Sequence, residues 1–317
     1  MEAPLKLVTG NANRPLADEI SRLLEIPLCQ AEVRQFPDGE TSVHIQETVR
    51  GDDIFVIQPT SPPVNEHLME LLLMIDALHR ASARRITAVV PYYGYGRQDR
   101  KHIGRVPISA RLVANLIETA RADRVLTLDL HAGQIQGFFN IPVDNLRSDP
   151  LIAEQITADQ DFIADMVIVA PDIGSAKRSR QIAGRLELPL AIVEKSRLDG
   201  RQVKAYNLIG EVRGKRAIIV DDILATGGTL VEAAELLMKN GARAVQAAIT
   251  HGLFAAESLE RIERSPLESV MVTNTIAPPP QARENGKITW VPVGELFAKA
   301  IKRIHEDRSV SQLIAHS

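Results

Sequence analysis

The chain has 317 residues and a formal net charge of −3, because 37 Lys and Arg side chains stand against 40 Asp and Glu. This length predicts about two domains, with a core large enough to fold without cross-links. The charge balance gives no overall positive field, which argues against nucleic-acid binding by bulk electrostatics, so any anion site must be local.

The single cysteine, Cys29, excludes a disulfide within the chain and is typical of a reducing compartment. The first ten residues lack the basic and apolar regions of an export signal. The most apolar helical stretch, 69–78, is interrupted by Glu70 and Asp76. We therefore expect a cytoplasmic protein without a membrane span.

Strands and helices are predicted to alternate along the chain. In the first half the predicted strands cover 6–9, 30–36, 41–46, 54–57, 86–90 and 125–128, with helices from Asn13, over 64–78 and from Pro107. In the second half the strands cover 167–169, 190–193, 218–220, 245–250 and 270–273, with helices over 174–186 and 229–240 and two short ones within 294–317.

This alternation predicts an α/β fold, in which mostly parallel sheets are covered by helices on both faces. We expect two similar domains, residues 1–147 and 148–317, and leave open whether the last helix packs on the first of them. The strands over 30–36 and 41–46 form a hairpin, and Pro37, Asp38 and Gly39 supply its turn.

The segment from Ala217 to Leu230, AIIVDDILATGGTL, joins an apolar strand, two acids and a glycine-rich loop. Asp221 and Asp222 are expected at the carboxyl end of the strand, where α/β sheets bind ligands, and carboxylates there suit sugar hydroxyls. Glycines let backbone N–H groups converge at a helix N-terminus, so the loop suits a phosphate. The loop residues are Ala225, Thr226, Gly227, Gly228 and Thr229.

A second polar segment, PYYGYGRQDRKHIGR over 91–105, leaves a predicted strand. Cations and tyrosines on one loop suit a polyanionic nucleotide, although a solvated surface loop is an equally good interpretation from composition alone. The side chains concerned are Arg97, Arg100, Lys101, Arg105, Tyr92, Tyr93 and Tyr95.

Six motifs together resemble class I ribose-phosphate diphosphokinases, the family that makes phosphoribosyl diphosphate. They are FPDGE, YYGYGRQDRK, LDLHAGQIQGFF, PDIGSAKR, EKSR and the 217–230 segment, in the family's order and over nearly the whole chain. The resemblance implies two domains of type I phosphoribosyltransferase-like fold, the first on the nucleotide side and the second binding the phosphoribosyl group. It also implies a homo-oligomer of the hexamer-of-dimers type.

The resemblance assigns roles to single residues. Phe36 and Arg97 are expected to stack on adenine, because an aromatic face and a guanidinium plane both suit a purine. In the family this pocket is completed across a subunit interface. The implied ATP-binding residues are Phe36, Asp38, Glu40, Arg97, Gln98, Asp99 and His131.

The cofactor implied is Mg²⁺, with His131 and Asp172 in the region of the metal and the ATP phosphates. Because Mg²⁺ prefers oxygen ligands, Asp172 is the better ligand of the two. Lys195 and Arg197 are implied as catalytic cations that meet charge on the transferred group, and the polar stretch after them, Leu198 to Gly210, is expected to be a mobile loop.

The implied reaction transfers the diphosphoryl group of MgATP to the anomeric hydroxyl of ribose 5-phosphate, which gives phosphoribosyl diphosphate and AMP. Two alternatives stay open: a phosphoribosyltransferase, which shares the 217–230 motif, and a non-catalytic regulatory subunit of a synthetase. The chain departs from the family at Gly96, where alanine is usual, at Ser196, where a second arginine is common, and at Ala225, which replaces an acid.

Overall fold

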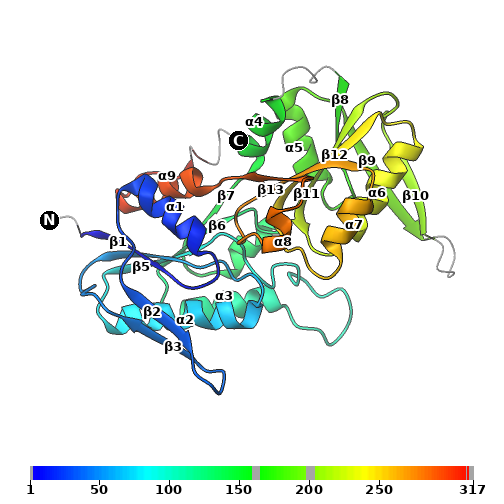
Figure 1. Cartoon of the computed structure of the whole chain (residues 1–317). Helices are drawn as coiled ribbons and strands as arrows, with labels where there is room; N and C mark the ends of the chain where they lie inside the picture. Colours follow the sequence, from blue (N-terminus) through cyan, green and yellow to red (C-terminus); the bar gives the residue numbers. More distant parts are fainter. Residues whose placement is uncertain (1–2, 159–164, 198–203, 312, 314–317) are drawn as a thin grey trace. The chain divides into compact units, whose positions relative to one another are not determined.

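The computed structural model describes residues 3–158, 165–197, 204–311 and 313, with the backbone alone for 195–197 and 204–206 (Figure 1). This part of the chain divides into two compact units. Unit 1 runs to Arg147 and includes Thr275–Ala277 and the segment from Pro292 onwards. Unit 2 comprises Ser148–Asn274 and Pro278–Val291.

Unit 1 contains a parallel five-stranded sheet in the order β1-β4-β5-β6-β7 and a separate antiparallel hairpin, β2–β3. The strands are β1 (Leu5–Thr9), β2 (Ala31–Gln35), β3 (Thr41–Ile45), β4 (Asp53–Ile57), β5 (Arg85–Val90), β6 (Arg124–Leu128) and β7 (Val143–Leu146). The helices are α1 (Arg14–Leu24), α2 (Val64–Arg80), α3 (Ser109–Thr119), the 3-10 helix η1 (Gly133–Phe138) and α9 (Gly294–His305).

Local sequence explains how the first helix begins. Asn13 caps α1, because its Oδ1 accepts a hydrogen bond from the Leu16 N–H at 3.3 Å, and Pro15 fits the first turn. The last helix, α9, packs against α1 (Figure 1), and a β-carbon on Gly294 would lie 2.3 Å from Glu19. The C-terminal part of the chain therefore returns to unit 1 and packs on its first helix.

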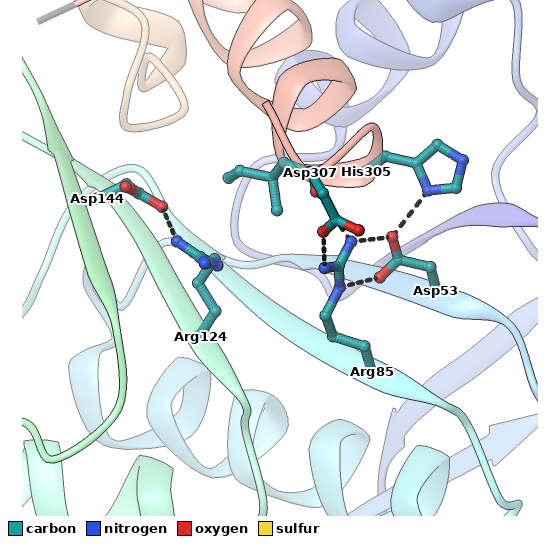
Figure 2. Close-up of polar contacts among 7 residues, drawn as sticks. Asp53, Arg85, Arg124, Asp144, His305 and Asp307 are labelled. Atoms are coloured by element: carbon teal, nitrogen blue, oxygen red, sulfur yellow. Dashed lines mark hydrogen bonds and ion pairs between the residues drawn. The ribbon is translucent and has the colours of Figure 1, made fainter. Parts of the chain in front are cut away.

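An ionic cluster fastens the end of α9 to the first residues of β4 and β5 (Figure 2). Arg85 Nε and Nη2 donate to the two Asp53 oxygens at 2.8 and 2.6 Å, and Nη1 donates to Asp307 at 2.8 Å. His305 Nδ1 lies 2.8 Å from Asp53 Oδ2. The cluster therefore ties residues at the C-terminal end of α9 to the start of the sheet.

Unit 2 contains a seven-stranded sheet in the order β10-β9-β8-β11-β12-β13-β14, parallel except for the β9–β10 pair. The strands are β8 (Met166–Ala170), β9 (Leu190–Arg197), β10 (Lys204–Ile209), β11 (Arg216–Leu224), β12 (Ala244–Gly252), β13 (Leu267–Thr273) and β14 (Ile288–Val291). The helices are α4 (Asp149–Thr157), α5 (Ala176–Leu186), α6 (Gly228–Lys239), α7 (Ser258–Arg264) and α8 (Pro280–Arg283).

The apolar run of β11 explains why this sheet is buried on both faces. Ala217 and Ile219 belong to one core cluster, whereas Ile218 and Val220 belong to another. Successive residues of a strand point to opposite faces, so the run supplies both layers. The predicted α/β fold class, with parallel sheets covered by helices, is confirmed.

Several element boundaries were predicted wrongly. The last predicted strand of the first half, 125–128, is followed by β7, which was not predicted and pairs beside β6, and the Arg124 guanidinium donates to Asp144 at 2.6 Å. The stretch 198–210, predicted to be a loop, contains β10, and β14 was not predicted. The second of the two short C-terminal helices falls mostly outside the described residues.

Among the helices described, none is both long and apolar enough to span a bilayer.

Candidate active site

Asp221 and Asp222 lie within β11, which continues to Leu224, so the prediction that the strand ends before them was wrong. β8 pairs with β11 only as far as Ile219, whereas β12 continues alongside to Gly252. The strand therefore outruns one neighbour, and its acids lie beyond the paired part of β8. This places them at the carboxyl end of the sheet, as the ligand-binding interpretation requires.

Burial, together with the charges of the neighbouring Asp222 and Asp172 carboxylates, raises the pKa of the Asp221 carboxyl to about 8. The Asp222 N–H donates to Asp221 Oδ1 at 2.9 Å, which partly opposes this rise in pKa. Asp221 is therefore mostly protonated at neutral pH in the free protein. A protonated carboxyl can donate a hydrogen bond as well as accept one.

The glycine-rich loop ends at Gly227, which caps α6 with a φ of +76°. This left-handed conformation favours glycine. α6 begins at Gly228, so the N–H groups of its first turn and the positive end of its dipole face the loop. The arrangement gives an anion site built largely from backbone.

Arg261 of α7 also lies at this loop. Its Nη1 is 3.6 Å from the point where a β-carbon on Gly228 would stand, and Thr226 Oγ1 is 3.9 Å from the same point. A cation and a hydroxyl thus converge beside the helix N-terminus. Arg261 was not predicted from the sequence, because it lies more than thirty residues after the loop and only folding brings α7 beside α6.

Asp172 follows β8, the strand beside β11, and precedes α5. Its Oδ1 accepts a hydrogen bond from the Ser175 N–H at 2.9 Å, and its carbonyl accepts one from Ser175 Oγ at 3.0 Å. Because the Asp172 charge raises the pKa of Asp221, the three carboxylates form one electrostatic group. The structure therefore brings Asp172 together with Asp221 and Asp222 in unit 2.

These carboxylates suit a hard divalent cation, since they supply oxygen donors whose mutual repulsion a cation relieves. In the described part of the chain, no three His, Cys, Asp or Glu side chains are already arranged as a metal site. Mg²⁺ usually takes one or two carboxylates together with water and substrate phosphate oxygens, so the residues present fit this ion without forming a complete cage.

In unit 1, Phe36, Asp38 and Glu40 lie on the turn of the β2–β3 hairpin. The turn is closed by the Phe36 N–H, which donates to the Glu40 carbonyl at 2.7 Å, and by Gly39, whose φ is +95°. The Phe36 side chain is 53% exposed. The ring and the two acids are therefore exposed at the turn, where Asp38 Oδ1 accepts a hydrogen bond from the Glu40 N–H at 3.2 Å.

Arg97, Gln98 and Asp99 lie on the loop after β5. Arg97 is exposed, whereas Gln98 accepts a hydrogen bond from Ser109 and Asp99 accepts one from Gln134 Nε2 at 2.9 Å. The loop is therefore tied to α3 and η1 by the two polar side chains, which leaves the guanidinium of Arg97 on the surface.

Two tyrosines of this loop are core residues, contrary to the nucleotide-binding interpretation of the segment. Tyr92 and Tyr93 are buried, and the Tyr93 hydroxyl donates to the Ala110 carbonyl at 2.9 Å. His131 is exposed and follows the turn after β6, where Asp129 takes a φ of +44°. His131 therefore follows a strained turn at the end of β6.

Lys195 and Arg197 lie at the end of β9, where their backbones pair with Tyr206 and Lys204 of β10. The side chains of both predicted catalytic residues lie outside the described part of the chain. The residues singled out by the sequence thus fall into two groups. Phe36, Asp38, Glu40, Arg97–Asp99 and His131 lie in unit 1, and Asp172, Lys195, Arg197, Asp221, Asp222 and Ala225–Thr229 lie in unit 2.

Comparison with known proteins gives full-length similarity. Residues 5–120 match the N-terminal domain of ribose phosphate pyrophosphokinase, and residues 196–315 match the phosphoribosyl synthetase-associated domain. The ribose-phosphate pyrophosphokinase of Hyphomonas neptunium is 51% identical over 98% of this chain and 99% of its own length. That of Thermotoga maritima is 52% identical over 98% of both chains.

A solved structure is similar over the same extent. The crystal structure of phosphoribosylpyrophosphate synthetase from Mycobacterium smegmatis superposes with a TM-score of 0.91. It is 40% identical in sequence and is matched over 96% of this chain and 99% of the other.

Proposed function

Because this chain belongs to the ribose-phosphate pyrophosphokinase family, we propose that it transfers the diphosphoryl group of MgATP to the anomeric hydroxyl of ribose 5-phosphate. The products are 5-phosphoribosyl 1-diphosphate and AMP. The observation that carries the proposal is sequence identity near one half over 98% of the chain. A phosphoribosyltransferase is not favoured, since the similarity includes the whole of 5–120.

Ribose 5-phosphate is assigned to unit 2. Its phosphate binds the Ala225–Thr229 loop at the N-terminus of α6, where the helix dipole and Arg261 favour an anion. Its ring hydroxyls bind Asp221 and Asp222 at the end of β11. The protonated form of Asp221 can donate to a hydroxyl oxygen, and an ionised neighbour accepts a hydroxyl proton in a hydrogen bond.

ATP is assigned to unit 1, with adenine between Phe36 and Arg97. The exposed ring of Phe36 and the surface guanidinium of Arg97 support this role, since both are accessible. The remaining ATP-binding residues proposed are Asp38, Glu40, Gln98, Asp99 and His131. In functional terms, residues 1–147 form the nucleotide-side domain, to which α9 is added, and the remainder of residues 148–317 forms the phosphoribosyl domain.

Mg²⁺ is the proposed cofactor, with Asp172 of unit 2 as its better protein ligand and His131 of unit 1 as the other proposed ligand. When bound, the ion neutralises charge on the ATP phosphates. The acidic group around Asp172 supports this assignment, because burial and the neighbouring carboxylates raise the pKa of Asp221, and a cation bound there would relieve the repulsion.

In the reaction, the anomeric oxygen forms a bond to the β-phosphorus, and the bond from that phosphorus to the bridging oxygen breaks. AMP leaves with the bridging oxygen, and the hydroxyl proton is released. Ala225 offers no acid or base for that proton. Lys195 and Arg197 are the proposed cations for the charge that develops on the transferred group.

A homo-oligomer is also proposed, of the hexamer-of-dimers type, together with a cytoplasmic location. The exposed Phe36 supports a nucleotide pocket that a neighbouring subunit completes. The test of the function is AMP release from MgATP, measured with and without ribose 5-phosphate and without any nucleobase. AMP must form only when the sugar phosphate is present, and its absence under all conditions contradicts the proposal.

A further inference from the structure

A buried carboxylate in α2 binds the loop that follows β1. Glu70 is 8% exposed, and its two oxygens accept three hydrogen bonds. Asn11 donates from its backbone N–H at 3.0 Å and from Nδ2 at 2.7 Å, and Gln58 Nε2 donates at 2.7 Å. A buried charge is costly unless donors surround it, and these donors meet that need.

The network extends to the rest of the loop. Gln58 is fully buried, and its Oε1 accepts from the Ala12 N–H at 3.2 Å. A β-carbon on Gly10 would stand 2.6 Å from the same oxygen. Side chains from α2 and from the residue after β4 therefore hold residues 10–12 in one conformation.

Asn11 carries this network outwards to the β2–β3 hairpin. Its Nδ2, already bound to Glu70, also donates to the Val33 carbonyl of β2 at 3.2 Å. Val33 is three residues before Phe36, so this contact lies roughly 10 Å along the strand from the exposed turn. The buried carboxylate and the hairpin are thus linked through a single side-chain amide.

β2 and β3 form a sheet of their own, and the backbone anchor to β1 lies before β2, where the Cys29 N–H donates to the Leu7 carbonyl at 2.8 Å, so the Val33 contact is a directional link further along the hairpin. Apolar side chains at its base, among them Val33 and Val43, pack on the core of unit 1, and β3 lies against α2. Apolar contacts are non-directional, so they hold the base without fixing its angle. The Asn11 hydrogen bond is directional.

We propose that Asn11 and Glu70 are positioning residues for the nucleotide: they fix the angle at which the hairpin presents Phe36, Asp38 and Glu40 to adenine. The proposal rests on the assignment of ATP to unit 1 in the proposed function. Neither Asn11 nor Glu70 is among the proposed ATP-binding residues, so a substitution of either is expected to affect only the part of ATP that the hairpin meets.

Two substitutions cut the link in different ways. Asn11→Ala removes Nδ2 but leaves the backbone N–H that donates to Glu70. Asn11→Asp keeps the size and shape but replaces the donor by an oxygen, which faces the Val33 carbonyl and the Glu70 carboxylate. The control is Ile75→Val, a buried apolar change in the same helix that loosens the core without touching the network.

The measurements are the KM values for ATP and ribose 5-phosphate and the inhibition constants of a non-hydrolysable ATP analogue and of tripolyphosphate. Both Asn11 variants are expected to raise the KM for ATP and the inhibition constant of the analogue by about tenfold, the upper range for one hydrogen bond. Tripolyphosphate, which has no adenine, and ribose 5-phosphate are expected to bind as in the unchanged chain. Ile75→Val is expected to leave both KM values and both inhibition constants unchanged.

Equal weakening of the analogue and of tripolyphosphate, or unchanged binding of both, overturns the proposal and leaves the network a purely structural one. Calorimetric titration of the analogue and of tripolyphosphate into the unchanged chain and into Asn11→Ala gives the same decision without turnover. If the unchanged chain binds the analogue but makes no phosphoribosyl diphosphate, the proposed function fails while the positioning proposal is still decided. Glu70→Gln, which places an amide donor against Asn11 or Gln58, replaces any Asn11 variant that does not fold.

Discussion

Arg261 Nη1 lies 3.6 Å from the point where Gly228 would carry a β-carbon, at the first residue of α6. The Cα–Cβ direction in a helix tilts toward its N-terminus, so the guanidinium lies on the side to which the first N–H groups point. Arg261 is 46% exposed and pairs with Glu257 at 3.5 Å, longer than a good ion-pair hydrogen bond. A phosphate in the loop can therefore compete for it.

Arg261→Gln is expected to raise the KM for ribose 5-phosphate by about tenfold, the lower range for a hydrogen bond to a charged group, with the KM for ATP unchanged. The matched control is Arg264→Gln in the same helix. Arg264 makes the same kind of pair, with Glu260 at 2.7 Å. Steady-state kinetics check both, and an equal effect of the two substitutions removes Arg261 from the site.

Gly227→Ala tests whether the left-handed cap shapes the phosphate loop. No atom outside the loop lies nearer than 3.6 Å to an added β-carbon there, so the cost comes from the φ of +76°. We expect about 1 kcal/mol of lost stability and a large loss of ribose 5-phosphate binding. Gly214→Ala, at a φ of +73° with nothing near the added carbon, is expected to lose similar stability without the binding defect. Urea unfolding and calorimetry measure the two quantities.

The pKa of Asp221 predicts a pH-dependent stability of the metal-free chain. Because this pKa rises from an ordinary 3.8 to about 8 on folding, unfolding releases a proton at every pH between these values. The stabilising effect of the protonated group is complete below the lower value and is lost as pH rises to the upper one. The slope is about 1.4 kcal/mol per pH unit.

Asp221→Asn removes this slope, so the stability of the variant relative to the unchanged chain is expected to increase from about pH 4 to about pH 8 and then level off. Urea unfolding of both proteins with EDTA over that range checks it. If the free energies of unfolding of the two proteins differ by the same amount at every pH in that range, the raised pKa of Asp221 is contradicted.

Lys195→Ala is expected to reduce turnover on the order of 100-fold, with a much smaller effect on the dissociation constant for ATP. The reason is that the proposed role concerns charge present only as the diphosphoryl group moves. Glu194→Gln, the preceding residue of β9, serves as the control. Single-turnover rates and nucleotide titrations separate the two effects, and unchanged turnover in Lys195→Ala removes the catalytic role.

The Asp53 cluster is expected to hold α9 to the sheet of unit 1. Asp53 is 4% exposed in its side chain and accepts two hydrogen bonds from Arg85, so Asp53→Asn is expected to cost about 3 kcal/mol. Asp307 pairs with the same arginine but is 84% exposed, and Asp307→Asn is expected to leave the unfolding midpoint unchanged. Equal losses of stability in Asp53→Asn and Asp307→Asn contradict the expectation that Asp53 contributes more than Asp307.

The sequence predicts best where one short apolar run decides the structure. β8, MVIVA, is buried throughout and was predicted from its composition, and the Asn13 cap located the start of α1. The failures concern relations between distant segments. β10 exists because it pairs with β9, and Arg261 reaches the loop because α7 packs beside α6.

At the site too, residues within one motif were predicted, whereas contacts between distant segments were not. Asp221, Asp222 and Gly227 were predicted because all three lie in one contiguous motif, the segment 217–230. The Asn11–Glu70 link was missed, because its donors and its acceptor lie 59 residues apart, and neither residue type is distinctive by itself. In the sequence, Glu70 is visible only as an acid within the apolar helical stretch 69–78, where it argues against a membrane span.

Transfer of the diphosphoryl group is tested most directly with MgATP radiolabelled at the β-phosphate and mixed with the protein and ribose 5-phosphate. We expect the label to move to phosphoribosyl diphosphate while unlabelled AMP is released, and we expect this transfer to require ribose 5-phosphate. Label that remains in ADP, which indicates transfer of the γ-phosphoryl group alone, or label that stays in ATP, contradicts diphosphoryl transfer by this protein.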